Sequence, residues 1–312
     1  MNAAPLPTTQ LPNSQLPSSI PEYLDQLRVA LAGADQALVQ DALYDAEEYL
    51  RSELAENLDK SEAEVIAAVA SSYGAPDEVA DIYRDTEVKV QTALRAPPPR
   101  PRKSAIGRFF GVAADPRAYA ALFYMVLSLA TGIFYFTWVV AGTSMSAGFA
   151  MLIIGIPFVI LFLGSVRMLS LLEGRIVEVM LGERMPRRPL YGARGKPLLE
   201  RIKDMFLDPR TWSTVLYFLA MLPLGIVYFT VAVSLTSVSL SLVLAPLALL
   251  PGVHFNLWMF GIDIPVQAPW LLPLLTVAGV VLLFATLHLA RGIGKLHGLF
   301  AKHLLVKSAQ YA

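Results

Sequence analysis

Residues Asp115–Ser146 read DPRAYAALFYMVLSLATGIFYFTWVVAGTSMS, and residues Asp208–Ser239 read DPRTWSTVLYFLAMLPLGIVYFTVAVSLTSVS. The two stretches align without a gap at an offset of 93 residues, with identical residues at positions such as Tyr124 and Tyr217. Both copies are apolar and long enough to cross a bilayer. This duplicated apolar unit predicts an all-α membrane protein made of two similar parts.

Four segments are predicted to span the membrane. At 1.5 Å per residue each reaches about 30 Å or more, the thickness of the hydrocarbon core. The predicted spans are Tyr119–Ala141, Phe149–Leu172, Thr211–Ser234 and Trp270–Ala290. We expect Gly142–Gly148 to form a tight turn. We interpret Val238–Leu250, which is short and holds Pro246, as a partial or re-entrant helix.

The composition agrees with a membrane protein that carries a soluble domain. Of the 312 residues 55% are hydrophobic, and the mean hydropathy is +0.53. Residues 1–96 carry a net charge of −11, and residues 97–312 carry a net charge of +11. The sequence holds no cysteine, which excludes disulfides, zinc–thiolate sites and cysteine nucleophiles.

The sequence divides into five predicted regions. Residues 1–19 are predicted to be disordered, residues 20–95 to form a small cytoplasmic helical domain, and residues 96–114 to form a linker rich in Pro and Arg. In the helical domain, Pro21 and Pro76 are expected to start helices, and Ser61 with Glu64 is expected to form a capping box. Residues 115–207 form membrane repeat 1, and residues 208–312 form repeat 2 with an outer insertion at 251–279.

The basic residues predict the orientation. In the membrane part, Lys and Arg fall in Arg100–Arg117, Arg167–Arg210 and Arg291–Lys307, and in neither of the other two loops. By the positive-inside rule these three regions are cytoplasmic, so both termini are predicted to be cytoplasmic. Each repeat contributes two spans, and we therefore expect the two copies to run parallel, related by a pseudo-twofold axis along the membrane normal.

The second halves of the repeats correspond at an offset of 124 residues, which places Glu173 opposite His297. Glu173, with Arg175 close by, begins an amphipathic stretch whose counterpart is Lys295–Lys307. We interpret both stretches as interfacial helices on the inner leaflet. The alternative is a relay of signal output through Glu173, Arg175 and His297.

Paired tyrosines and threonines are candidates for a ligand or lipid site between the repeats. Tyr135 and Thr137 of the first copy correspond to Tyr228 and Thr230 of the second, and all four are predicted in the outer halves of their spans. Helix packing combined with an aromatic interfacial belt is the alternative.

The outer insertion contains a second candidate ligand or lipid site, formed by His254, Trp258 and Asp263. These residues belong either to a sensory loop or to an interfacial loop with tryptophan anchors. One histidine and one aspartate do not make a metal site.

The second helix of the cytoplasmic domain has an acidic face formed by Asp41, Asp45, Glu48 and Glu56. Such a face is a plain solvated surface or a docking surface for a basic partner. A third alternative is that it docks on the chain's own basic loop, Arg184–Lys203.

Motifs that carry chemistry are absent from the sequence, which holds no Gly-rich phosphate loop, nucleophile elbow, kinase motif or metal-spaced histidines. We therefore predict no enzyme, no cofactor and no metal site. Anionic headgroups explain the basic loop Arg184–Lys203, so direct binding of nucleic acid is not expected. Acids and bases are nearly absent from the spans, which argues against a pump or a coupled transporter.

The membrane part resembles the sensor domain that precedes histidine kinases in actinobacteria and related bacteria. The resemblance rests on Gly132–Thr137 (GIFYFT), on Gly155–Pro157 (GIP) and on Glu173–Gly182, and it covers about Asp115–Lys307. It implies a multi-pass protein of the bacterial inner membrane.

Residues Pro21–Glu87 resemble the HAAS domain. The resemblance rests on Tyr23–Leu27 (YLDQL), Asp45–Tyr49 (DAEEY), Lys60–Val65 (KSEAEV) and Gly74–Glu78 (GAPDE). Such domains precede membrane spans and are often encoded beside PadR-like transcription regulators, which implies membrane-linked signalling, with a PadR-like regulator or another cytoplasmic protein as the candidate partner.

These observations predict a non-enzymatic signalling protein that relays membrane or envelope state to a cytoplasmic partner such as a PadR-like regulator. The alternative is a small permease or lipid-binding protein with a site between the two repeats. A wet or lipid-filled cavity lined by Tyr135 and Tyr228 would favour this alternative, and tight dry packing would count against it. A scaffold that forms homo-oligomers is a third hypothesis.

Overall fold

The structure is a computed structural model that describes residues 17–94, 104–149, 155–188, 203, 206–250, 257–259 and 261–306. The residues predicted to be disordered lie outside this description up to residue 16, and residues 96–103 of the predicted linker also lie outside it. The chain divides into two compact units. The first comprises Met1–Val90 with Arg188–Ala193, and the second comprises Gln91–Arg187 with Arg194–Ala312.

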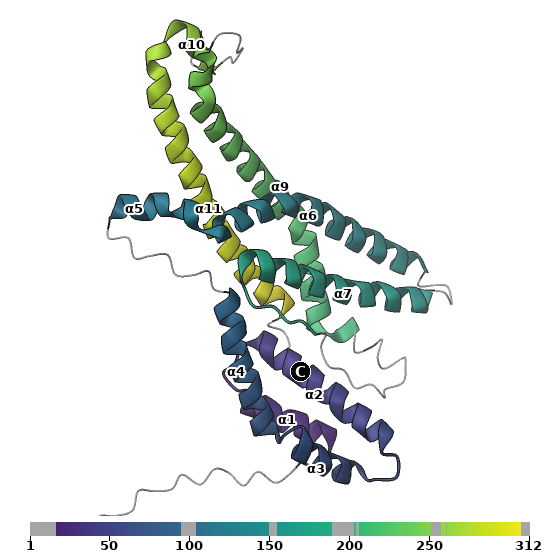
Figure 1. Ribbon diagram of the computed structural model, residues 1–312. Coiled ribbons are helices and arrows are strands. Elements are labelled where there is room, and N and C mark those ends of the chain that lie inside the picture. Colours follow the sequence, from purple (N-terminus) through teal and green to yellow (C-terminus); the bar gives the residue numbers. More distant parts are fainter. Residues whose placement is uncertain are drawn as a thin grey trace, which may run out of the picture. The chain divides into compact units, whose positions relative to one another are not determined.

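The first unit contains four helices around a core of its own. They are α1 (Ile20–Ala30), α2 (Gln36–Glu56), α3 (Glu62–Ser72) and α4 (Pro76–Leu94) (Figure 1). Apolar residues at helical spacing fill the centre, with Tyr23, Leu27 and Leu50 almost fully buried. The predicted capping box is present, since Ser61 and Glu64 bond each other's backbone N–H groups.

The second unit carries the membrane-length helices. Its helices and strands are α5 (Ala105–Phe110), η1 (Gly111–Ala114), α6 (Pro116–Phe149), α7 (Gly155–Leu181), α9 (Pro209–Leu244), η2 (Ala245–Leu249), β1 (Trp258–Met259), β2 (Ile262–Asp263), α10 (Ile264–Gln267), η3 (Pro269–Leu271) and α11 (Leu272–Leu305). Four helical segments are long and apolar enough to cross a membrane, namely Pro116–Phe149, Pro157–Leu181, Pro209–Leu249 and Pro269–Leu305. The all-α class and the four membrane-length helices are therefore confirmed.

The helices run further than the sequence predicted. Gly142–Gly148 is not a turn but the last part of α6, because the segment holds no proline or charge and glycine alone costs a helix only about 1 kcal/mol. Gly142 also faces the Phe162 ring, where a Cβ would lie 2.1 Å from a ring carbon. Val238–Leu250 is not a re-entrant helix, since most of it continues α9 into η2.

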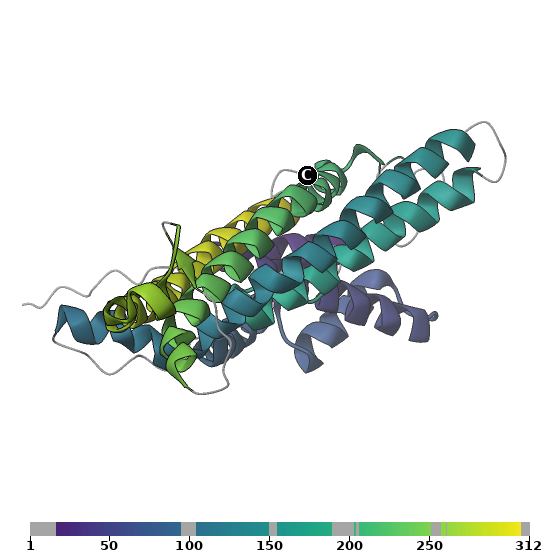
Figure 2. The same cartoon turned by 90° about the horizontal axis from the view of Figure 1, so that it is seen from above.

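The two hairpins, α6–α7 and α9–α11, contact each other through the first helix of each. Gly132 of α6 lies against the Met221 carbonyl of α9, and Gly225 of α9 lies against the Ser128 carbonyl of α6. As residue numbers rise along α6 they fall along α9, so these two helices run in opposite senses at their contact. The positive-inside rule places loops but does not say which helix faces meet. Figures 1 and 2 show the hairpins leaving this contact in different directions.

The described residues 257–259 and 261–271 of the outer insertion form a small cap next to the α9–α11 hairpin. Strands β1 and β2 pair antiparallel, with Trp258 opposite Asp263, and Gly261 has the positive φ of 82° that the tight connection requires. Ile264, Leu272 and Ala245 form a separate small apolar cluster that holds this cap.

Candidate functional site

A buried carboxylate lies at the contact between the two repeats. The side chain of Glu173, on α7, is fully buried and accepts hydrogen bonds from three tyrosine hydroxyl groups. Tyr124 and Tyr217 donate to Oε1 at 2.8 and 2.9 Å, and Tyr135 donates to Oε2 at 2.9 Å. The tyrosines come from α6 and α9, so one carboxylate joins three of the four long helices. A hydrogen bond to a charged group contributes about 1.5–3 kcal/mol.

The fourth helix completes the cluster through His297. Its imidazole is buried on α11, and Nε2 lies 2.6 Å from the Tyr124 hydroxyl and 3.0 Å from the Tyr217 hydroxyl. Nδ1 lies 3.4 Å from the hydroxyl of Tyr228, which is only half-buried. We call Glu173, His297 and the four tyrosines the polar cluster. It joins α6, α7, α9 and α11.

Each member of the polar cluster has its counterpart in the other repeat. Tyr124 corresponds to Tyr217, Tyr135 to Tyr228 and Glu173 to His297. The acidic and basic members of the cluster therefore occupy corresponding positions of the two repeats.

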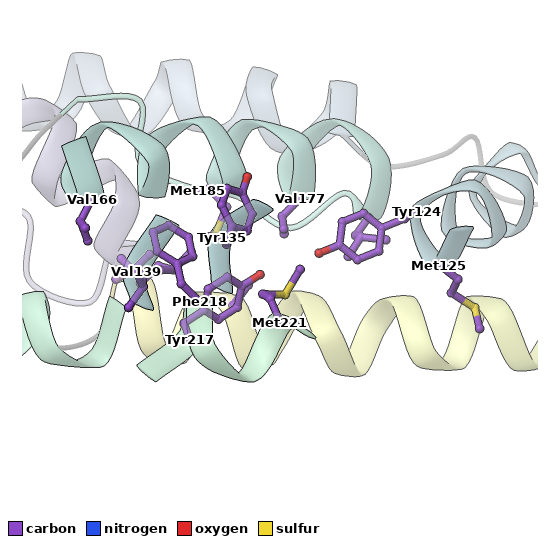
Figure 3. Close-up of a cluster of buried hydrophobic side chains, with 14 of the residues drawn as sticks. Tyr124, Met125, Tyr135, Val139, Val166, Val177, Met185, Tyr217, Phe218 and Met221 are labelled. Atoms are coloured by element: carbon purple, nitrogen blue, oxygen red, sulfur yellow. The ribbon is translucent and has the colours of Figure 1, made fainter. Parts of the chain in front are cut away.

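Apolar side chains surround the polar cluster. Figure 3 shows the rings of Tyr135, Tyr217 and Phe218 next to one another with Met221 beside them. Tyr135 stacks on Phe218 with ring centroids 4.5 Å apart. The hydroxyl groups thus meet in an apolar environment, where hydrogen bonds between polar groups are stronger and an unpaired polar atom is more costly than in water.

Two glycines bring the helices close enough for this cluster to form. A Cβ at Gly132 would lie 2.5 Å from the Met221 carbonyl oxygen, and a Cβ at Gly225 would lie 2.3 Å from the Ser128 carbonyl oxygen. Both positions therefore require glycine, as at close helix contacts in membranes generally. This backbone contact is tight packing, and it counts against the alternative of a ligand or lipid site between the repeats.

Ion pairs exchanged between the repeats flank the contact. Arg167 on α7 pairs with Asp208 at the start of α9 at 3.0 Å, and Arg291 on α11 pairs with Asp115 before α6 at 3.2 Å. The two aspartates and the two arginines are again repeat counterparts. Each Asp-Pro-Arg segment is thus held by the other copy.

The predicted interfacial helices are absent as separate elements. Glu173 and His297 lie inside the continuous helices α7 and α11, and both are buried at the contact between the repeats. Because α7 continues past residue 173, the Glu173 carboxylate points inward, where hydrogen bonds from hydroxyl groups offset the free-energy cost of burying it. Arg175 does not belong to the polar cluster. Its guanidinium pairs with the Glu178 carboxylate at 2.8 Å, and the Arg187 guanidinium pairs with the same carboxylate at 3.0 Å.

The structure separates the other candidate ligand residues from the polar cluster. Tyr135 and Tyr228 belong to the cluster, whereas Thr137 and Thr230 are exposed on the outside of their helices. His254 lies outside the described residues. Trp258 is exposed, and Asp263 Oδ1 is a buried atom without a hydrogen-bond partner among the described residues. Within the described part of the chain, no group of three or more His, Asp or Glu side chains is placed to hold a metal ion.

The acidic face of α2 is divided between two environments. Glu48 and Glu56 are exposed, while Asp41 is buried and accepts the backbone N–H of Arg188 at 2.8 Å. Asp45 pairs with the Arg188 guanidinium at 2.9 Å and accepts the Tyr83 hydroxyl at 3.0 Å.

Arg188 belongs to the same compact unit as α2. Its carbonyl accepts the Gln40 side chain, and its guanidinium lies 5.8 Å from the centre of the Tyr44 ring. Burial raises the pKa of Tyr83, as do the nearby Tyr73 and Asp45. The tyrosine therefore stays a neutral donor that orients the Asp45 carboxylate.

Sequence reasoning identified Tyr135, Tyr228, Glu173 and His297 separately but did not bring them together. It placed the two tyrosines near the outer surface and Glu173 at the inner one. The available signal was the repeat itself, because Tyr124 and Tyr217 are identical polar residues in corresponding apolar helices. Their distance from Glu173 depends on how α6, α7 and α9 pack together, which no local pattern reveals.

Comparisons with known proteins agree with a sensory role for the membrane unit. No curated protein and no solved structure matches the chain. The sequence model of the family described as "Putative sensor" matches residues 124–305, which include every member of the polar cluster. This match covers more than half of the chain, and the chain therefore belongs to this sensor family.

Proposed function

We propose that the chain is a multi-pass signalling protein of the bacterial inner membrane that relays membrane or envelope state to a cytoplasmic partner. The observation that carries the proposal is the polar cluster, which ties all four long helices to one buried carboxylate and one buried imidazole. Its members lie within the segment matched by the sensor family. In this proposal the chain has no catalytic step of its own.

The polar cluster suits a relay because intermediate positions of the hairpins leave buried polar groups without hydrogen bonds. Moving one hairpin against the other separates the Tyr217 hydroxyl from Glu173 and the His297 imidazole from Tyr124, and each buried partner left unpaired costs about 1–3 kcal/mol. The two glycine contacts also allow little gradual movement. A membrane stimulus that favours a different hairpin arrangement therefore shifts the unit between discrete packed states.

The output proposed here is the four-helix unit, which resembles the HAAS domain. Arg188 follows the end of α7 by seven residues and bonds Asp41 and Asp45 of α2. A change in α7 thus has a short covalent route to the segment that occupies this acidic face. We propose that a PadR-like regulator with a basic surface docks on Asp45, Glu48 and Glu56, and competes with Arg188 for Asp45.

The test uses the full-length protein in lipid nanodiscs and the purified PadR-like regulator of the same organism. The variant Asp45→Asn/Glu48→Gln/Glu56→Gln is expected to lose capture of the regulator, because it removes the acidic docking charges but keeps the buried Asp41. The matched control Asp77→Asn/Asp85→Asn neutralises two exposed carboxylates on α4 of the same unit and is expected to keep binding. Absence of capture by the wild-type protein, or equal loss in both variants, would rule out this docking surface.

The proposed orientation places the basic segments and both termini in the cytoplasm. The charge distribution supports it, since Lys and Arg avoid the connections after α6 and after α9. Because the hairpins leave their contact in different directions, each hairpin must then be inclined to the membrane normal for both tips to reach the outer side.

A further inference from the structure

Four atoms of the polar cluster form a closed ring of hydrogen bonds. Glu173 Oε1 and His297 Nε2 lie on opposite sides, and the hydroxyls of Tyr124 and Tyr217 bridge them on two parallel paths. Each tyrosine supplies one hydrogen, a carboxylate only accepts, and a neutral imidazole carries one hydrogen. These rules limit where the hydrogens of the ring can be placed.

In the state with fewer protons, one arrangement uses all four contacts. Both tyrosines donate to the ionised Glu173, and His297 carries its hydrogen on Nε2, from which the two tyrosine oxygens accept. If the hydrogen were on Nδ1 instead, the two tyrosine hydrogens would serve only two of the four contacts. The ring therefore selects the Nε2–H tautomer and leaves Nδ1 as an acceptor facing the Tyr228 hydroxyl.

The ring limits where a further proton can be placed. With one proton more, the ring stays complete with Glu173 ionised and His297 doubly protonated, with Glu173 protonated at Oε1 and Nε2 accepting from both tyrosines, or with Glu173 protonated at Oε2 and Tyr135 accepting. Nδ1 carries a hydrogen in the first two arrangements, in which Tyr228 changes from donor to acceptor, whereas the third places the proton beside Tyr135, which is buried. The 3.4 Å contact between Nδ1 and Tyr228 is the longest of the cluster, and Tyr228 is its half-buried member, so this side is the one open to proton exchange.

One added proton removes the net charge of the cluster. The titratable groups that face the pair are Tyr124 and Tyr135 on α6, Tyr217 and Tyr228 on α9, and Glu183, whose side chain lies against Gly298 next to His297. Three arginines, Arg291, Arg167 and Arg187, pair with Asp115, Asp208 and Glu178, respectively. An unpaired buried anion is costly, and one proton makes the cluster neutral.

We propose that Nδ1 of His297 is a proton-binding site, at which the polar cluster takes up one proton while the hydrogen bond to Tyr228 reverses its direction. The proton moves from water to Nδ1, and no covalent bond other than the new N–H changes. This inference goes beyond the proposed relay, because it assigns a ligand to the membrane unit without reference to a cytoplasmic partner.

The first experiment measures the wild-type protein and needs no variant in the cluster. Full-length protein labelled with ¹⁵N-histidine is placed in phosphatidylcholine nanodiscs, and imidazole ¹⁵N signals are recorded between pH 4 and 9. The chain has four histidines, and His297→Gln identifies the relevant signal. We expect the Nε2–H tautomer at high pH and protonation of Nδ1 as the pH falls. An Nδ1–H tautomer at high pH, or no change over this range, would overturn the proposal.

The second experiment tests the coupling to the carboxylate. Glu173→Gln keeps the side-chain volume but removes the charge that stabilises the added proton, so the midpoint of the His297 transition should fall by about one pH unit or more, a tenfold change in proton affinity. The matched control is Glu183→Gln, which removes a nearby carboxylate that has no tyrosine bridge to His297. An equal shift in both variants, or no shift with Glu173→Gln, contradicts the proposed site.

Discussion

Removing one hydroxyl at each of two corresponding positions tests the polar cluster most directly. Tyr135→Phe deletes the donor to Glu173 Oε2, and among the described residues no other hydrogen bond reaches that oxygen. Tyr228→Phe deletes the same group at the corresponding position of the other repeat, where the contact is 3.4 Å long and half-buried. Both changes remove one oxygen atom from the same residue type, so each serves as the matched control of the other.

The expected magnitudes differ because the partners differ. A buried hydrogen bond to a charged group contributes about 1.5–3 kcal/mol, whereas an ordinary one contributes about 0.5–1.5 kcal/mol, and a long, half-buried contact belongs at the low end. For a unit of this size 1 kcal/mol shifts the midpoint of thermal unfolding by about 2–4 °C. Tyr135→Phe should therefore lower the midpoint by about 3–12 °C, and Tyr228→Phe by about 1–3 °C.

The assay is thermal unfolding of the purified protein in detergent, followed by circular dichroism and repeated in a second detergent. Equal shifts for the two variants, or a larger shift for Tyr228→Phe, would refute the assignment of Glu173 as the anionic centre of the cluster. A small effect of Tyr135→Phe alone would show that Oε2 has another partner.

Three further predictions concern the helix contact, the orientation and the capping box. Gly132→Ala and Gly225→Ala should each lower the free energy of unfolding of the membrane unit by about 1–3 kcal/mol through overpacking. Gly164→Ala is the control, because Gly164 has open space around it, and should leave the stability unchanged. An unchanged stability of Gly132→Ala would contradict the close contact. Because the chain has no cysteine, single cysteines placed at Ser146 and at Trp258 can be labelled selectively with a membrane-impermeant maleimide. We expect the reagent to modify both positions from outside the cell. Labelling of either position from the cytoplasmic side only would contradict the proposed orientation. Hydrogen bonds from the Ser61 backbone and hydroxyl hold the pKa of Glu64 below its ordinary value, so its stabilising effect is present above the unfolded-state pKa and is lost as the pH falls through the folded-state pKa. Glu64→Gln should thus increase amide exchange in α3 relative to wild type at pH 7 but not at acid pH, as measured by hydrogen exchange, and an increase of equal size at both pH values would contradict this.

Local patterns predicted the first unit closely. Pro76 starts α4, Pro21 lies in the first turn of α1, and the Ser61–Glu64 box begins α3 as the sequence indicated, because each of these signals acts over one helical turn. The four apolar segments were equally clear from length and hydropathy.

The site itself required information that a local pattern does not hold. Glu173 reads as the polar end of a span when only its neighbours in sequence are considered. Its burial depends on three hydroxyls that lie 38 to 49 residues away along the chain. Helix ends were missed for a related reason, since packing of Phe162 against Gly142 extends α6 where composition alone suggested a turn.

The correspondence of Glu173 with His297 also shows what covalent duplication makes available. Two identical chains that met through the same symmetric contact would have to place glutamate opposite glutamate, or histidine opposite histidine. Two carboxylates or two imidazoles buried at these two positions would repel each other when both are charged. With both halves encoded in one polypeptide, the two positions can change independently, and an acid can face a base across a symmetric scaffold. Restoring the symmetry by His297→Glu should therefore weaken the contact between the hairpins far more than a change of similar size on their lipid-facing surfaces.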